Sequence, residues 1–494
     1  MKKGAIHILA ASASLAAMAC ATPALAAAHK QPSNAELMKL LKDQAAKIDA
    51  LEQQVQTLQA KQGEQAQAVA AATAARSQQA QTDAQVAAAA QDQRNQDVAA
   101  LQAQVAQLTT RSKHDVKVSW NEGGPTFGSQ DGHFSFHPKG RIVTDFSTTS
   151  GSSYPARNIT GTEFRDLRLG AEGNIGKIGY NLDVDFAGNV VSVKEAYISY
   201  TTKLFGLNSK TYIGNSLNDR SIEGATELVG LPFAERNAVA NVAVPQVGYF
   251  GLGLQERLGG KGWHISGAVK GGDNGDNDGT HNDSIAYFTR GHLNPILTKD
   301  AFIHLGAWGY WETLNAPVSI NKTSAIATDF NGEVKVSASS IAGVKSDRGY
   351  GFEAGAGWHS FWAFGEYGQR TLMVPAGLDI DQKAWSVYGG VFLTGEKPGY
   401  SSRSGVLARP KVLHSITDGG LGAFELLGRY DKYDFTDAAR GGEGNALTLG
   451  GNWYLNNFMD LKLNYIFWKT QNQVGAFPGD DTGHTLLLRG EIVW

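Results

Sequence analysis

The end of the chain alternates between apolar and polar positions in the manner of a β-strand. One face of residues 485–494 is apolar and comprises Leu486, Leu488, Ile492 and Trp494. The other face is mixed and comprises Leu487, Arg489, Glu491 and Val493. A strand of this kind that ends on an aromatic residue is typical of a transmembrane β-barrel, where lipid covers the outer face. We expect this strand to close the barrel by pairing with a first strand near residues 115–146.

Similar alternation recurs from about residue 115 onward. It is clear in residues 134–136, 167–169, 182–186, 198–200, 424–430 and 461–467. Clusters of Gly, Asn and Asp at residues 271–275 and 441–445 indicate turns between strands. At the strand and loop lengths of outer-membrane barrels, residues 115–494 accommodate about 16 antiparallel strands. The predicted fold is therefore an all-β transmembrane β-barrel, and a soluble β-sandwich or β-helix of similar composition is the alternative.

A pattern with a seven-residue period occupies residues 33–112. Leu37, Leu51 and Leu58 share one heptad register, and Leu41, Ile48 and Val55 share the other. This pattern predicts an N-terminal α-helical coiled coil, which resumes with a slipped phase at Val98, Leu101, Val105 and Leu108. Because the Ala- and Gln-rich middle buries little surface, a loosely helical, partly disordered arm is the alternative. We expect the arm to lie in the periplasm, as a trimerisation element or a spacer.

Residues 1–26 have the features of a secretory signal peptide. Lys2 and Lys3 precede an apolar stretch, and Ala24-Leu25-Ala26 forms a small-residue cleavage site. The single cysteine, Cys20, lies inside this segment, so the mature chain is expected to contain no disulfide. A lipoprotein signal at Cys20 is the competing interpretation. No later stretch approaches the roughly 20 consecutive apolar residues that a membrane-spanning helix needs.

Three ordered motifs carry a resemblance to a known family. They are Phe-Arg-Asp-Leu-Arg-Leu-Gly-Ala-Glu-Gly at residues 164–173, Tyr-Asn-Leu-Asp-Val-Asp-Phe-Ala at 180–187, and Val-Ser-Val-Lys-Glu-Ala-Tyr-Ile-Ser-Tyr at 191–200. With shorter motifs at residues 392–396, 452–456 and 464–465, they resemble the phosphate-selective porin O and P family of Gram-negative outer membranes. The resemblance covers roughly residues 115–494. It implies a trimeric, 16-stranded porin whose anion-selective members line the pore with arginine and lysine.

Two positions depart from the family pattern. Arg165 is followed by Asp166, where the family often has two adjacent arginines, and Leu217 stands where the family often has a lysine. Both departures remove positive charge. Phosphate selectivity therefore does not follow from the resemblance alone.

Strand parity directs many charged side chains to the inside of the predicted barrel, because an Arg or Lys facing lipid near the midplane costs about 2 to 4 kcal/mol. The residues expected to line the pore and set its selectivity are Arg141, Arg168, Arg220, Arg236, Arg429, Arg489, Asp183 and Asp185. The same parity places Asp145, Asp166, Glu172, Asn181, Glu425, Asp431 and Glu491 inside. Opposite charges that pair across strands and only rigidify the wall are the alternative.

Net charge does not decide which ions such a pore prefers. From position 115 onward, 33 basic and 39 acidic residues leave a net charge of −6. An anion preference therefore requires a local cluster of cations. Arg220 and Arg236 lie in the Gly- and Pro-containing stretch at residues 214–245, which we predict to fold inward as a constriction loop. An ordinary extracellular loop followed by a strand is the alternative.

No motif indicates a catalytic residue, a metal site or a cofactor. Residues 274–279 imitate the start of a calcium loop, but Ile285 occupies the position where a bidentate Glu is required. His281, His292 and His304 are about a dozen residues apart, which is a hairpin spacing rather than a metal-ligand spacing. An outer-membrane enzyme such as a lipase would need a Ser–His pair at the membrane rim, and none is apparent. We expect no enzymatic activity.

Two functions from different classes follow. The first is an outer-membrane porin that admits small hydrophilic solutes by passive diffusion, with anions such as phosphate foremost. Its expected partners are outer-membrane lipid and two further copies of the chain in a homotrimer. The second is a structural anchor whose coiled coil bridges to peptidoglycan. Neither function involves nucleic acid.

Overall fold

The computed structural model describes residues 53, 56–57, 76–121, 123–272, 284–320, 323–374 and 379–494. The predicted signal peptide, the heptads before residue 53 and the acidic run at residues 274–279 lie outside these residues. Contacts divide the chain into two units, Met1–Val105 and Ala106–Trp494. No helix within the described residues has both the length and the apolar character needed to cross a membrane.

Helix α2 (Arg76–His114) is the long helix of the described residues. The predicted apolar positions Val98, Leu101 and Val105 are each more than half exposed on it. Helical structure was therefore predicted correctly for this part of the arm. The coiled coil itself needs partner chains and stays a prediction.

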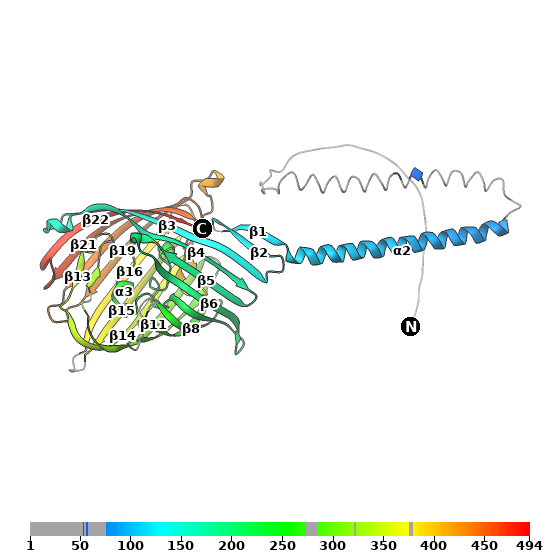
Figure 1. Cartoon of the computed structure of the whole chain (residues 1–494). Helices are drawn as coiled ribbons and strands as arrows, with labels where there is room; N and C mark the ends of the chain where they lie inside the picture. The colour runs from blue at the N-terminus through cyan, green and yellow to red at the C-terminus, as the bar shows by residue number, and fades with distance from the viewer. Residues whose placement is uncertain are drawn as a thin grey trace, which may run out of the picture. The chain divides into compact units, whose positions relative to one another are not determined.

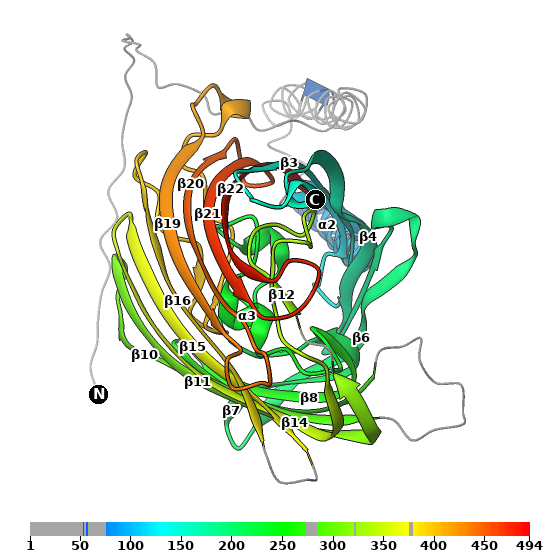
Figure 2. The same ribbon diagram turned by 90° about the vertical axis from the view of Figure 1, so that its left-hand side faces the viewer.

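The second unit is a closed antiparallel β-barrel (Figures 1 and 2). Sixteen strands of the described residues form its wall. They are β3 (Phe134–Ser150), β4 (Thr160–Ile175), β5 (Ile178–Asp185), β6 (Ser192–Leu204), β7 (Leu207–Leu217), β8 (Phe250–Gly260), β9 (Trp263–Gly271), β10 (Ile285–Leu297), β11 (Ala301–Ile320), β14 (Ile341–Trp358), β15 (Phe361–Met373), β16 (Ile380–Phe392), β19 (Ala423–Asp434), β20 (Glu443–Tyr454), β21 (Met459–Asn472) and β22 (Gly479–Val493). Each strand pairs with the next in this series, and β22 pairs back onto β3. The predicted barrel is confirmed.

The closing seam joins the two ends of the wall. β22 pairs with β3 from His484 opposite Ser150 to Val493 opposite Arg141. Trp494 extends the pairing, because its N–H donates to the Gly140 carbonyl at 3.0 Å and the Gly140 N–H donates back at 2.9 Å. A Cβ at position 140 would lie 2.4 Å from the Trp494 indole, so this position has room only for glycine.

The partner strand begins later than we predicted from the sequence. Before it, β1 (Val116–Asn121) and β2 (Gly124–Ser129) form a separate hairpin, which pairs with β3 only at Phe127 and Gly128. The first strand-like residues after the arm therefore pair with each other instead of entering the wall. β3 nevertheless overlaps the range of residues 115–146 in which we expected the first strand.

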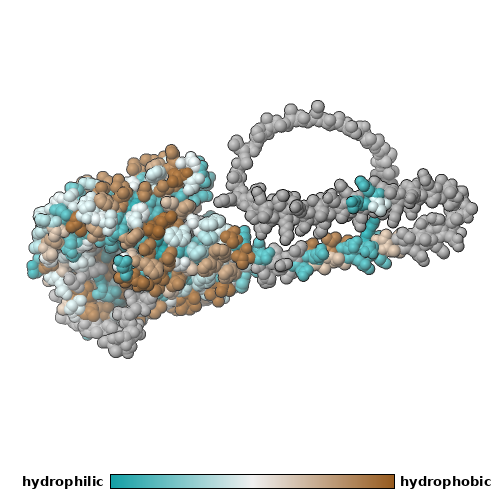
Figure 3. Space-filling model, turned by 45° about the horizontal axis from the view of Figure 1, so that its top comes forward, coloured by the Kyte–Doolittle hydropathy of each residue, from teal (hydrophilic) through white to brown (hydrophobic). Residues whose placement is uncertain are grey.

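Side chains of the wall are apolar outside and polar inside, which is the reverse of a soluble protein. Leu169 and Leu426 are 54% and 53% exposed, whereas their neighbours Arg168 and Glu425 are 8% and 2% exposed. Apolar side chains accordingly cover much of the outer face that Figure 3 shows. The alternation read from the sequence thus separates a lipid-facing surface from the interior.

Three segments fold into the barrel. The inner segment, residues 218–249, connects β7 to β8 and contains the turn η3 (Leu228–Gly230) and the short helix α3 (Ala238–Val242). A second segment, residues 323–340, contains β12 (Thr323–Ala325) and β13 (Lys335–Ser337). The strap, residues 393–422, connects β16 to β19 and contains β17 (Tyr400–Ser401), β18 (Val406–Leu407) and the turn η4 (Ile416–Asp418). Figure 2 shows α3 and β12 inside the ring of strands.

The inner segment is anchored to the wall by carboxylates that accept its backbone N–H groups. Glu366 accepts from Ile222 at 2.8 Å, Asp431 accepts from Ala238 at 2.9 Å, and Glu312 accepts from Val247 at 2.8 Å. Irregular backbone inside a barrel has few main-chain partners, so charged acceptors on the wall compensate for their loss. The predicted inward fold of residues 214–245 is therefore present, with slightly different bounds.

Candidate functional site

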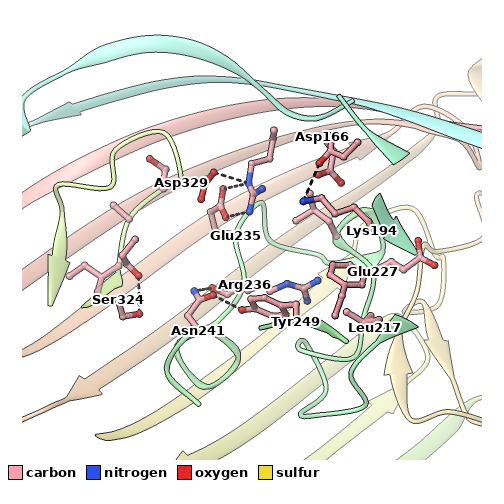
Figure 4. A pocket seen from close by; sticks show the side chains of 18 of the residues that line it. Asp166, Lys194, Leu217, Glu227, Glu235, Arg236, Asn241, Tyr249, Ser324 and Asp329 are labelled. Atoms are coloured by element: carbon pink, nitrogen blue, oxygen red, sulfur yellow. Dashed lines mark hydrogen bonds and ion pairs between the residues drawn. The ribbon is translucent and has the colours of Figure 1, made fainter. Parts of the chain in front are cut away.

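A cavity of about 380 Å³ lies inside the barrel (Figure 4). Strands β3 to β6 supply one wall, and the inner segment and residues 323–329 supply most of the opposite wall. Its cationic lining consists of Arg141, Arg165, Arg168, Lys194, Arg236 and Arg429. Its anionic lining consists of Asp166, Asp185, Glu195, Glu227, Glu235 and Asp329. The charges are equal in number, so any ion preference must come from how they are paired.

Two lining cations, Arg165 and Lys194, reach the cavity because they sit at β-bulges. The pairing of β4 with β3 skips Arg165, and the pairing of β6 with β5 skips Lys194. A bulge adds one residue and re-aims side chains relative to strict alternation. Strand parity therefore missed both residues. The sequence does carry a signal that could have revealed them: each is a charged residue at a position where strict alternation would place the side chain in lipid.

Arg141 and Arg168 are held by carboxylates of the same wall. Both contact Asp183, at 3.0 and 3.3 Å, and Arg168 lies 3.1 Å from Asp166. The Glu227 carboxylate of the inner segment lies 3.4 Å from Arg141, and its side chain is 57% exposed. Opposite charges therefore pair along this wall, as the alternative interpretation of the sequence predicted.

Arg165 contacts carboxylates from both inward segments. It lies 3.4 Å from Glu235 and 3.7 Å from Asp329. Burial by itself would raise the pKa of Glu235, but Arg165 and Arg489 outweigh burial and hold this pKa below its ordinary value. Glu235 is therefore ionised at neutral pH and neutralises much of the Arg165 charge.

Arg236 and Arg220 differ from the other cations of this region. Their guanidinium carbons lie 5.0 and 5.2 Å from the centroid of the Tyr249 ring, within cation–π distance. Arg236 donates to the backbone carbonyl of Glu223, and Arg220 donates to the Ala240 carbonyl at 3.1 Å. Burial lowers the pKa of Arg236, although a guanidinium stays protonated at neutral pH. No carboxylate of the described residues lies within 4.0 Å of either guanidinium.

The structure divides the residues predicted to line the pore into two groups. The first group lines the cavity and comprises Arg141, Arg168, Arg236, Arg429 and Asp185. The second group does not line it and comprises Arg220, Arg489 and Asp183. Ala234 and Glu235 of the inner segment cover Arg489, which donates to the Ala234 carbonyl and lies 3.1 Å from Glu235. Strand alternation points these side chains into the barrel. An inward-pointing side chain lines the cavity only where none of the inward-folded segments covers it.

A histidine cluster was also missed. His264 on β9, His292 on β10 and His304 on β11 form a row with ring centroids 4.6 and 5.3 Å apart. His264 lies opposite His292, and Gly306, the partner of His292, is two residues from His304. The spacing between His292 and His304 that argued against a site therefore brings two of these rings together, and the register of β9 with β10 adds His264. Among the described residues, no group of three or more His, Cys, Asp or Glu side chains has an arrangement suited to a metal ion.

Comparison with known proteins assigns the chain to a family. The family model for phosphate-selective porin O and P matches residues 136–494. The chain belongs to this porin family. Porin O of Pseudomonas aeruginosa is 25% identical over 428 residues, which cover 76% of this chain and 91% of that protein. An uncharacterised protein of Caulobacter vibrioides is 28% identical over 394 residues, which cover 74% of each chain.

Solved structures of outer-membrane proteins resemble this porin only loosely. An anion-selective porin from Comamonas acidovorans superposes with a TM-score of 0.45 and 14% identity, covering 73% of this chain and all (100%) of the other. OmpT of Vibrio cholerae superposes with a TM-score of 0.49 and 12% sequence identity, covering 73% of this chain and 98% of the OmpT chain. These likenesses bear on neither substrate nor assembly. Family membership places the porin in the outer membrane and makes it a channel rather than an enzyme.

Proposed function

We propose that this porin admits small hydrophilic solutes by diffusion and favours anions such as phosphate. One observation carries the proposal. Of the six cations that line the cavity, Arg236 is the one without a carboxylate within 4.0 Å in the described residues. The other five are each paired with one or more acidic side chains.

An unpaired cation at a narrow point attracts anions more strongly than a paired one. A unit charge about 4 Å from an anion contributes about 1 kcal/mol in bulk water and about 4 kcal/mol at an effective dielectric constant of about 20. Arg220, whose guanidinium carbon lies 5.2 Å from the centroid of the same Tyr249 ring, adds to the same field. Local charge of this kind explains how a barrel region with a net charge of −6 can favour anions.

The test is the reversal potential of the porin in a planar bilayer under a salt gradient. Arg236→Gln should lower the permeability ratio of chloride to potassium by roughly fivefold, which corresponds to about 1 kcal/mol. The control is Arg348→Gln, because Arg348 is exposed and pairs with Asp379 at 3.2 Å outside the cavity. A wild-type preference for cations, or an unchanged ratio in Arg236→Gln, would sink the anion proposal.

The 39-residue helix α2 supports a second role for this protein in addition to transport. We propose that the N-terminal arm, residues 33–112, follows a cleaved signal peptide of residues 1–26 and lies in the periplasm. There it would promote a homotrimer or bridge to peptidoglycan. Deleting residues 27–112 separates these roles. Failure of the cell envelope with intact conductance supports the bridge, whereas monomeric porin on a native gel supports trimerisation.

A further inference from the structure

The strap is an unusual connection for its end of the barrel. Other connections of the described residues at this end are short, such as Gly176–Lys177 between β4 and β5 and Phe205–Gly206 between β6 and β7. In outer-membrane barrels the short turns face the periplasm. The strap, at residues 393–422, is instead long and returns into the lumen. A long segment at this end, packed inside, is expected to have a role beyond joining two strands.

The hairpin of the strap is docked on the wall by directional contacts. Arg290 donates to the carbonyl of Ser404 at 2.9 Å, and His292 contacts the carbonyl of Ser402 at 3.1 Å. The ring of Tyr400 stacks on Phe302 with centroids 4.2 Å apart. The strap is therefore fixed to strands β10 and β11.

The strap also supports the inner segment, which enters from the opposite end of the barrel. The Leu407 N–H donates to the Thr226 hydroxyl at 3.0 Å. Arg409 of the strap donates to the Val229 carbonyl at 3.4 Å. Leu407 and Val412 share a buried apolar cluster with Ile222 and Phe233 of the inner segment. The position of the constriction thus depends on contacts with the strap.

A chain of hydrogen bonds through two histidines links the same two segments. Asp219, in the inner segment, lies 3.1 Å from His264 Nε2. His264 Nδ1 contacts His292 Nδ1. His292 Nε2 reaches the Ser402 carbonyl of the strap, and its ring lies against Gly405.

Counting protons gives the protonation state that satisfies every contact in this row of hydrogen bonds. A carboxylate and a carbonyl accept at the two outer ends, so each Nε2 must carry a proton. The Nδ1–Nδ1 contact requires one further proton between the rings. Three protons and one positive charge on the pair satisfy all of these contacts. A fourth proton would place two N–H groups face to face, and the rings would have to separate.

The charged groups around the pair make a further positive charge unfavourable. Arg257 and Arg290 both contact Asp219, at 2.9 and 3.0 Å. Arg290 also pairs with Glu353 at 2.8 Å, and Glu353 lies 3.0 Å from His304. The two guanidinium groups already match the two carboxylates of this described cluster. The first imidazolium charge therefore has no carboxylate of its own, and a second would add to the imbalance.

We propose that the strap positions the constriction from the periplasmic end, and that acid releases it by adding a second charge to the His264–His292 pair. Separation of the rings displaces Ser402 and Gly405 from the wall. The contact between Leu407 and Thr226 then fails, and the inner segment loses its support. The inference rests on the pore of the proposed function but not on its ion preference.

The test compares single-channel recordings from about pH 7.5 down to about pH 3.5, because a pair that already carries one charge takes up a second proton only in stronger acid than a single imidazole, whose pKa is about 6.5. The wild-type porin should show higher conductance and more current noise in acid. His292→Gln should remove this change, because an amide donates to the Ser402 carbonyl but takes up no proton. Heat-modifiable gel mobility checks that the variant is folded, and the reversal potential at about pH 7.5 reports ion preference separately.

His304→Gln is the matched control. His304 Nδ1 lies 2.8 Å from the Tyr400 hydroxyl, and His304 takes no part in the row of hydrogen bonds from Asp219 to Ser402. This variant should therefore keep the acid response. Hydrogen exchange of residues 400–407, corrected for intrinsic pH dependence, should rise in acid in the wild type and not in His292→Gln. An acid response that persists in His292→Gln, or a wild type without one, would overturn the inference.

Discussion

Replacing Arg489 with methionine should strongly destabilise the barrel. Arg489 on β22 forms two hydrogen bonds with Asp145 on β3, at 2.7 and 2.6 Å, across the closing seam. The two side chains are 0% and 1% exposed. The variant leaves the Asp145 carboxylate buried without its cation, and Glu235 loses one of its two arginine partners.

The size of the effect follows from burial. Breaking a buried ion pair by removing one partner costs about 3 to 5 kcal/mol, because an uncompensated charge stays in the interior. Adding Asp145→Asn removes that charge, so the double variant should recover part of the loss. Arg348→Met is the control, because Arg348 and Asp379 are 44% and 41% exposed. Removing an exposed pair of this kind costs about 0 to 1 kcal/mol.

The assay is urea unfolding in lipid vesicles, followed by tryptophan fluorescence and by gel mobility. Each variant is compared with the wild type in the free energy of unfolding. If Arg489→Met loses no more than Arg348→Met, or if Asp145→Asn gives no recovery, the assignment of Arg489 to the seam is refuted.

Three further outcomes test other parts of the structure. Burial raises the pKa of Glu223 to about 8. The neutral form of Glu223 therefore contributes stability that is fully present below its ordinary pKa of 4.5. This stability is lost as the pH rises through about 8. Glu223→Gln should therefore flatten the pH dependence of the unfolding free energy between these values. Gly405→Ala should undock the strap, because φ is +61° and a Cβ would lie 2.5 Å from the His292 ring, and trypsin should then cleave there. Gly395→Ala, where φ is +96° but the space is open, should leave the strap docked. Leu426→Arg, on the lipid-facing side, should cost about 2 to 4 kcal/mol in unfolding free energy if the residue lies near the midplane.

Local alternation was sufficient to predict the barrel and the inward faces of its strands. Arg141, Arg168, Asp183 and Arg429 all have the inward orientation that their parity predicted, and each is 8% exposed or less. Parity could be read because the two-residue period of a strand reports directly on which face meets lipid. It failed where a bulge interrupts pairing, as at Arg165.

The sequence by itself determined the fold class, the closing strand and the separation of lipid-facing from inward residues, because these depend on neighbours along the chain. Only the tertiary structure decided which inward residues meet the cavity. Because segments distant in sequence fold into one lumen, Arg489 is covered, and Arg236 has no carboxylate of the described residues within 4.0 Å. The same holds for His264 and His292, whose contact arises from the register of adjacent strands. The spacing of charges along a chain does not specify their pairing in space, and it is the pairing that bears on which ions a pore prefers.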